Sequence, residues 1–220
     1  KTFSFTYTND PRVGFATVLV LVVFLITTVV GGYSIVKRLV AFLYFQNART
    51  AFEAGGDAAH VERSLARAIE FFPADVLYRS LIDIRLIQIK ALLQRQDVGA
   101  EALRAEFQDL LGSATAAGNA AIAVNPTDYV NWLALARVYA SLVPLKVEGA
   151  YESAKPLLQN ARKLNPKSPR LALDEARLEI AHGSSDEGKK LVGEALQMKS
   201  NYTDAIFVLA QLEIDAGNVK

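Results

Sequence analysis

An uninterrupted apolar segment near the start of the chain restricts its fold more than any other feature. Residues 13–36, "VGFATVLVLVVFLITTVVGGYSIV", carry no charge and include fifteen Val, Leu, Ile or Phe residues. As a helix this segment is about 36 Å long, which exceeds the roughly 30 Å hydrocarbon layer of a bilayer. Each central apolar side chain favours insertion by roughly 0.3 to 0.6 kcal/mol. The sequence therefore predicts a transmembrane helix over 13–36, in contact with the lipid bilayer, after a flanking segment 1–12.

Three other interpretations of this segment fit less well. A buried helix of a soluble protein normally shows a polar face, and here the only polar interruptions are Thr17, Thr27, Thr28 and Ser34. A cleaved signal peptide has a shorter apolar region and a small-residue cleavage site, which the following "YSIVKRLVAFLYF" does not offer. The β-branched residues suit strands, but the run is longer than ordinary strands.

The residues after the apolar segment predict that the same helix continues beyond the membrane. No helix breaker occurs before Gly55, and Tyr33, Phe42 and Tyr44 are expected near the membrane interface. Downstream cations outnumber upstream cations by one; the two sets are Lys37, Arg38 and Arg49 against Lys1 and Arg12. The positive-inside rule then favours a cytoplasmic location for the C-terminal part.

Composition argues against several classes of function. The net charge is +1 and no run of like charge occurs, so we expect no nucleic-acid partner. The absence of cysteine excludes disulfides, thiolate nucleophiles and cysteine-based zinc sites. His60 and His182 lack a metal-ligand pattern and are expected to be solvated turn residues, so no metal site is predicted. No phosphate-binding loop and no GxSxG motif occurs, so we expect no cofactor and favour a non-enzymatic protein.

One charged segment has its own interpretation. Asp174, Glu175 and Glu179 alternate with Arg170 and Arg177 in a predicted helix. Such a pattern is typical of an exposed helix face with weak ion pairs. We expect that arrangement here, and not a catalytic pair of carboxylates.

The rest of the chain contains a repeated pattern of helix pairs. Ala68, Ala161 and Ala195 occupy the same offset in three segments, each on a helical face with large apolar residues. Pro73 and Pro166 then end the first two segments. Upstream of each segment lies another helical stretch closed by glycine. Small residues at such positions let two helices approach closely, so neighbouring hairpins are expected to stack.

These residues resemble the tetratricopeptide repeat family. The family's first-helix positions look like Trp132, Leu135, Ala136 and Tyr139, and its second-helix positions look like Ala154, Leu158, Ala161 and Pro166. From Pro169 to Tyr202 the spacing is the family's 34 residues. The resemblance implies an all-α fold in which the transmembrane helix precedes an α-solenoid of helical hairpins.

We expect residues 37–220 to form this repeat domain. Its predicted units are about 42–75, 76–126, 127–168, 169–202 and a truncated 203–220. The second unit is longer than the family repeat and is interpreted as two extended helices, 76–95 and 100–124. Residues 140–149 hold six residues more than the family's turn. The last unit stops where a second helix is due, which suggests a fragment of a longer protein.

The resemblance also implies a binding surface. First helices of such repeats line a concave groove, and by family position this groove would present Leu133, Arg137, Leu173, Asp174, Arg177, Phe207 and Gln211. Arg137 and Arg177 fall at the same repeat position, so a carboxylate of a protein or peptide partner is a possible ligand. The family's Lys and Asn carboxylate clamp is not reproduced, and an ordinary solvated surface is the alternative.

Two functions of different classes follow. The first is a membrane-anchored interaction scaffold that recruits or organises partners at the bacterial envelope. The second is the C-terminal repeat region of a multi-span envelope glycan enzyme of the O-antigen ligase or polymerase type. A full-length sequence with about ten further apolar spans would favour the second function, and a single span would favour the first.

Overall fold

The computed structural model describes residues 11–95 and 99–217, and every regular element in these ranges is helical. The chain divides into two compact units, the first ending at Phe72 and the second beginning at Pro73. The prediction of an all-α chain is confirmed. The segment 81–90, which alternates in places like a strand, lies within a helix, as predicted.

The first unit contains one very long helix. Helix α1 (Pro11–Glu53) has 43 residues and is about 65 Å long. It includes a window with a mean hydropathy of 2.8 in which no residue is buried, and by length and composition it is long enough to cross a membrane. A signal sequence near an N-terminus meets the same criterion. The helix is continuous from the apolar segment to Glu53, as predicted, and residues 1–10 of the predicted flanking segment lie outside the described ranges.

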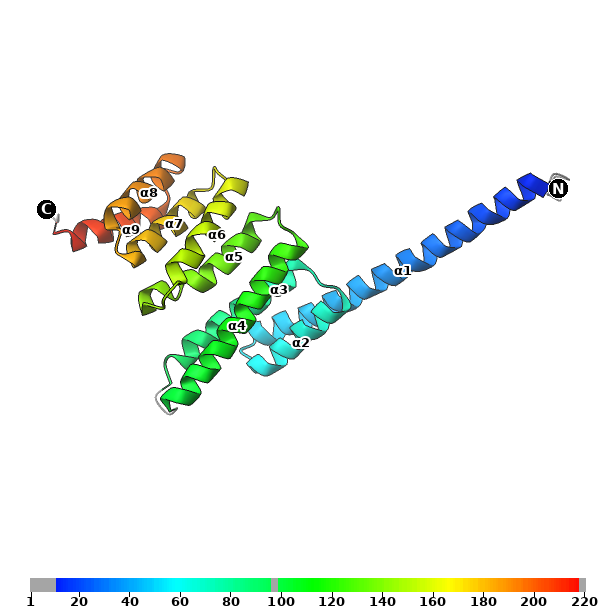
Figure 1. Ribbon diagram of the computed structural model, residues 1–220, viewed down its shortest axis with the longest axis horizontal. Helices are drawn as coiled ribbons and strands as arrows, with labels where there is room; N and C mark the ends of the chain where they lie inside the picture. Colours follow the sequence, from blue (N-terminus) through cyan, green and yellow to red (C-terminus); the bar gives the residue numbers. More distant parts are fainter. Residues whose placement is uncertain (1–10, 96–98, 218–220) are drawn as a thin grey trace. The chain divides into compact units, whose positions relative to one another are not determined.

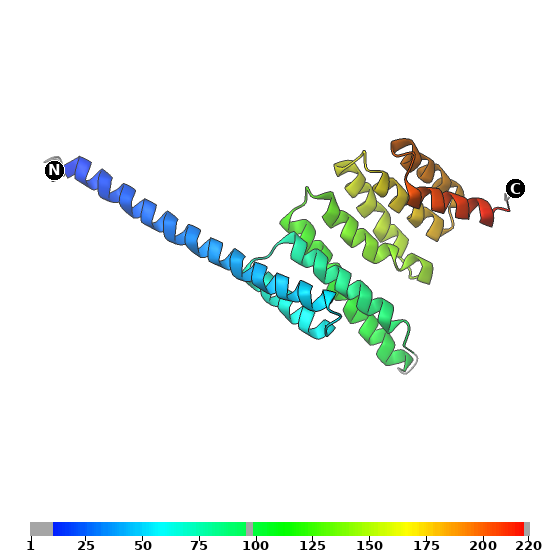
Figure 2. The same ribbon diagram turned by 180° about the vertical axis from the view of Figure 1, so that it is seen from behind.

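The last part of α1 forms a hairpin with α2 (Ala58–Phe71), and both views show the two helices side by side (Figures 1 and 2). Gly55 adopts φ 68°, a left-handed conformation that glycine accepts without strain, and so reverses the chain. The carboxylate of Asp57 then accepts a hydrogen bond of 3.1 Å from the amide of Ala59 and caps α2. The residues buried between the helices are Ala41, Ala48, Val61, Leu65 and Ala68.

The second unit consists of helical hairpins that follow one another along the chain (Figure 1). The helices are α3 (Asp75–Leu92), α4 (Ala100–Val124), α5 (Tyr129–Ala140), α6 (Ala150–Leu164), α7 (Pro169–His182), α8 (Ser185–Met198) and α9 (Thr203–Asp215). A short 3₁₀ helix, η1 (Val143–Leu145), lies between α5 and α6. The predicted pair of long helices is thus confirmed as α3 and α4, whereas part of their connection, 96–98, lies outside the described ranges.

Helix α6 packs between its hairpin partner and the next hairpin, as the small-residue pattern predicts. Ala154, Leu158 and Ala161 are buried in a core that also contains Leu133 of α5 and Leu171 of α7. Leu164 follows Ala161 by three residues, so helical spacing predicts it on the same buried face. It is instead 43% exposed, because α6 ends at this residue. Close contact at the two alanines therefore joins consecutive hairpins.

Candidate partner-binding groove

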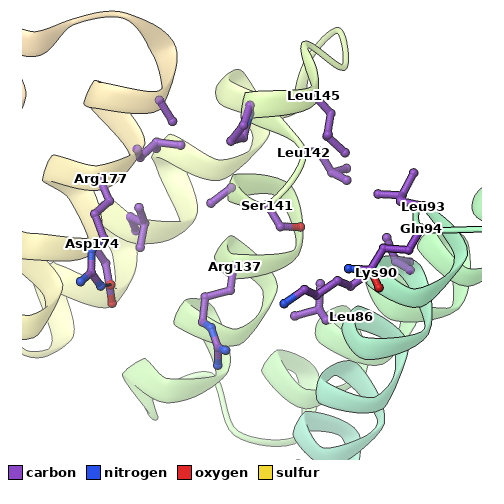
Figure 3. Close-up of a pocket in the computed structure, with 16 residues that line it drawn as sticks. Leu86, Lys90, Leu93, Gln94, Arg137, Ser141, Leu142, Leu145, Asp174 and Arg177 are labelled. Atoms are coloured by element: carbon purple, nitrogen blue, oxygen red, sulfur yellow. Dashed lines mark ion pairs between the residues drawn. The ribbon is translucent and has the colours of Figure 1, made fainter. Parts of the chain in front are cut away.

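A groove of about 690 Å³ opens within the second unit, between α3, α5, η1 and α7. Figure 3 shows Leu86 of α3 and Leu93, the C-cap of α3, on one side and Arg177 of α7 on the other. Most of the lining is aliphatic, which is the usual character of a site that buries an apolar ligand group.

The long connection after α5 supplies one edge of this groove. Helix α5 ends at Ala140, and Pro144 then takes an early position in η1, where its missing N–H costs nothing. Leu142 is buried in the core, whereas Leu145 is 49% exposed and lines the groove. Lys146 ends η1 in the left-handed region, at φ 57°. The additional residues of 140–149 thus build a wall that a shorter turn would lack.

The charged residues that line the groove are three cations and one carboxylate. Lys90 extends from α3, Arg137 from α5 and Arg177 from α7 (Figure 3). Arg137 makes an ion pair of 3.6 Å with Asp83, and both side chains are more than half exposed, so the pair holds the guanidinium only weakly. The groove therefore combines an apolar surface with excess positive charge.

The carboxylate is Asp174, which the arginines surround at a distance. Its oxygens lie 3.8 Å from Arg170 Nε and 3.7 Å from Arg177 Nη1, longer than hydrogen bonds. Among the described residues, Asp174 Oδ2 is buried and has no hydrogen-bond donor. Burial raises the pKa of Asp174, and the cations of Arg170, Arg177 and Arg137 offset this rise only in part.

The C-terminal part of the chain matches a known protein family. Residues 148–195, which include α6, α7 and most of α8, match the family model described as tetratricopeptide repeat. This part of the chain therefore matches a tetratricopeptide repeat.

Solved structures of other proteins share this fold. A thermophilic repeat protein of Thermus thermophilus is 17% identical, with a TM-score of 0.58, and the match covers 80% of this chain and 83% of that one. A monomeric mutant of IFIT1 with Gppp-AAAA is 19% identical, with a TM-score of 0.52, covering 81% of this chain and 44% of that one. At such identity the likeness concerns the fold alone. Comparison with curated proteins finds no match.

The structure brings together three of the residues that the repeat positions predict for the groove, namely Arg137, Asp174 and Arg177. The prediction that they bind a partner stays a prediction. Leu133 is 3% exposed and reaches only a smaller neighbouring depression of about 230 Å³. Leu173 is completely buried, so its side chain belongs to the core and not to the groove surface.

The remaining two predicted residues lie on α9, away from this groove. Phe207 is 71% exposed, and Gln211 donates a hydrogen bond of 2.8 Å to Asp215 on the same helix. Neither residue is part of the groove lining, because the lining elements end at α7.

Sequence reasoning did not find several lining residues. Leu86 and Leu93 belong to a helical face of α3 that is visible in the sequence, and Lys90 lies one turn after Leu86. That periodicity was a usable signal for α3. No comparable signal exists for Leu142 and Leu145, because the conformation of an irregular connection does not follow from periodicity.

The expectation of an exposed carboxylate face on α7 is wrong. The Glu175 side chain is 13% exposed and pairs with Arg162 of α6 at 2.5 Å. Arg162 also pairs with Glu194 of α8, so one guanidinium joins three helices of two repeats. Glu179 is 8% exposed, pairs with Lys155 at 2.9 Å and accepts hydrogen bonds from the Tyr151 hydroxyl. These carboxylates lie between repeats because α7 is covered on both sides by neighbouring helices.

The histidines have structural partners. His60 Nε2 lies 2.9 Å from Asn47 Oδ1, which connects α2 to α1. The ring of His182 stacks on Tyr151, with 3.6 Å between the ring centroids and an angle of 7° between the planes. Within the part of the chain that the structure describes, no group of His, Cys, Asp or Glu side chains has the arrangement of a metal site.

Proposed function

We propose that this protein is a membrane-anchored tetratricopeptide repeat scaffold that binds partner proteins at the bacterial envelope. The observation that supports binding is the groove between α3, α5, η1 and α7, which is apolar, open to solvent and bordered by cations. The fold provides such grooves because first helices of consecutive hairpins stand side by side.

The lining of the groove suggests the chemistry of the partner segment. Leu86, Leu93 and Leu145 offer a surface for one apolar side chain, whose burial stabilises a complex. Arg137 and Arg177 offer two guanidinium groups for a carboxylate, which Arg binds through paired hydrogen bonds. The proposed ligand is therefore an acidic peptide segment with an apolar anchor.

The membrane part of the proposal depends on α1. Its apolar side chains between Val13 and Val36 are largely exposed, which is the state expected of a helix surrounded by lipid. The excess of cations after this segment favours the cytoplasm for the repeats. A scaffold in this position would concentrate its partners at the inner surface of the membrane.

Site-specific photocrosslinking in membranes tests the groove. A photoreactive residue at Leu93, which is 44% exposed in the groove, is expected to capture a defined partner segment. The same residue at Leu164, which is 43% exposed and is not part of the groove lining, is the matched control. Equal capture at both positions would contradict the proposal.

A synthetic peptide of the captured segment tests the role of charge. Replacing both Arg137 and Arg177 by alanine should weaken binding by about tenfold for each lost charged hydrogen bond. Removing Lys190 and Arg67 instead changes the net charge equally, at exposed positions outside the groove, and should leave affinity unchanged. The arginine variant should also lose its preference for the acidic peptide over the corresponding amide.

Topology is testable because the chain contains no cysteine. A cysteine introduced at the exposed Ser185 should resist a membrane-impermeant maleimide in intact cells and react after lysis. Labelling in intact cells would place the repeats outside, and release of the protein by alkaline carbonate would refute the membrane anchor itself.

A further inference from the structure

Basic and aromatic side chains gather around α1 where its apolar segment ends. Lys37 Nζ lies 4.8 Å from the ring centroid of Tyr33, and Arg38 Cζ lies 4.8 Å from that of Phe72. Phe71 stacks on Tyr44 with 5.8 Å between the ring centroids. We name Tyr33, Lys37, Arg38, Phe71 and Phe72 the interfacial collar.

The collar depends on the tertiary structure of the first unit. Phe71 ends α2 and Phe72 is its C-cap, yet both lie beside residues of α1 that are far away in the sequence. The cause is the antiparallel α1–α2 hairpin, in which α2 returns toward the apolar segment (Figures 1 and 2). Helix α2 and its C-cap therefore bring Phe72 beside Arg38 and Phe71 beside Tyr44, both beyond the apolar segment.

Among the residues that the structure describes, the cations of the collar have no carboxylate partner. Between Asp10 and Glu53 the sequence contains no acidic residue. Within the described ranges, neither Lys37 nor Arg38 makes an ion pair with a carboxylate, whereas Arg49 on the same helix pairs with Glu53 at 2.7 Å. Aromatic rings attract these cations but do not neutralise them. The positive charge of the collar is therefore available to bind an anion.

We propose that the interfacial collar binds the anionic phospholipid headgroups of the membrane surface where α1 emerges. This inference rests on the proposed membrane anchor. Aromatic side chains prefer the headgroup level, and cations beside a span are attracted to acidic lipids. The collar adjoins the apolar segment directly, which selects a lipid surface over a soluble anion. Through Phe71 and Phe72, the end of α2 rests on the bilayer and holds the hairpin against it.

The proposal predicts a depth for each part of the hairpin. Phe52 lies near the end of α1 and is 50% exposed. At 1.5 Å per residue it is about 21 Å farther along the helix than Arg38. A probe at Phe72 should therefore contact lipid, and a probe at Phe52 should not.

Tryptophan quenching in vesicles measures these depths. The chain has one tryptophan, so Trp132→Phe gives a background for single-tryptophan variants of the full chain. Phospholipids brominated close to the headgroup should quench Phe72→Trp and leave Phe52→Trp unquenched. Phe24→Trp, in the middle of the apolar segment, should be quenched by lipids brominated near the end of the acyl chain. This last probe reports on the membrane anchor independently.

Lipid mixtures test whether the collar prefers anionic headgroups. In vesicles of phosphatidylglycerol and phosphatidylcholine, Phe72→Trp should be quenched more when the bromine is on phosphatidylglycerol. The enrichment should reach up to roughly fivefold per cation. It should approach one when Lys37 and Arg38 are both replaced by glutamine. Arg49→Gln removes a cation that is already paired and should leave the enrichment unchanged.

The outcomes separate the two proposals. Quenching of Phe24→Trp without quenching of Phe72→Trp would leave the anchor intact and overturn the collar. Quenching of Phe72→Trp without lipid preference would also overturn the proposal of anionic headgroups. An unquenched Phe24→Trp would refute the membrane anchor, and the collar with it.

Discussion

Gly118 shows how closely helices α4 and α5 approach one another. A Cβ atom at Gly118 of α4 would lie 2.6 Å from Leu135 Cδ1 and 2.9 Å from Leu135 Cβ. The second of these atoms is fixed to the backbone of α5 and cannot move aside without shifting the helix. Gly112, on the same helix, would meet nothing within 4 Å. The two glycines therefore have different roles.

We predict opposite effects of alanine at these two positions. Gly118→Ala should lower the free energy of unfolding by about 1 to 3 kcal/mol because it overpacks the α4–α5 contact. Gly112→Ala should raise it by about 0.5 to 1 kcal/mol because glycine in an open helix interior is costly. Urea unfolding in detergent micelles, followed by circular dichroism, measures both changes. Equal stability of the two variants would contradict the packing described here.

At the scale of elements, stability depends on how α6 crosses its neighbours. Ala161 is completely buried, and so are Leu171 of α7 and Ala136 of α5 in the same core. The small side chain at residue 161 sets the distance between hairpins.

Leucine at residue 161 should force the hairpins apart. We expect Ala161→Leu to lower the free energy of unfolding by about 1 to 3 kcal/mol. Ala116→Leu makes the same chemical change at an exposed position of α4 and should have little effect. Thermal unfolding of the two variants and the wild type decides the matter, and an unchanged midpoint for Ala161→Leu would refute the role of Ala161.

At the scale of the whole molecule, two aspartates whose side chains are similarly exposed should respond to pH in opposite directions. Partial burial raises the pKa of Asp75, but the hydrogen bond from Asn131 and the Arg79 cation, 3.1 Å away, outweigh it and lower the pKa below its usual value of 3.8. Arg79 also pairs with Asp128 at 3.1 Å, so this cluster joins α3 to the start of α5. Asp174, by contrast, has a pKa raised by burial.

Whether each ionised aspartate raises or lowers the free energy of unfolding depends on how its pKa differs between the folded and the unfolded chain. Ionised Asp75 stabilises the fold above its unfolded pKa, and this contribution disappears as the pH falls through its lower folded pKa. Ionised Asp174 lowers the free energy of unfolding at pH values above its raised folded pKa. This destabilisation disappears as the pH falls to the pKa that Asp174 has in the unfolded chain. At pH 7, Asp75→Asn should therefore unfold more easily than wild type and Asp174→Asn less easily. Unfolding midpoints at pH 7 and in acid test this, and shifts of the same sign would contradict it.

Much of the architecture was accessible from the sequence because it depends on periodic patterns. The apolar segment of α1, the glycine and proline boundaries and the small residues of α6 each follow from one-dimensional spacing. The resemblance to tetratricopeptide repeats, and not spacing alone, placed Arg137 and Arg177 at equivalent positions of first helices, so their presence on one groove was predictable. The wall formed by η1 was not, because an irregular connection has no period.

What the sequence by itself determined is therefore the helical hairpins, their order and the faces they bury. Only the tertiary structure decided which charged residues are covered and which distant residues meet. In the sequence, Glu175 and Glu179 look like part of a solvated helix face. In the structure, neighbouring helices cover them, and each pairs with one cation of α6. Phe72 reaches Arg38 only because the hairpin folds back. The physical reason is that helix formation depends on local spacing, whereas burial and long-range pairing depend on what packs against each helix.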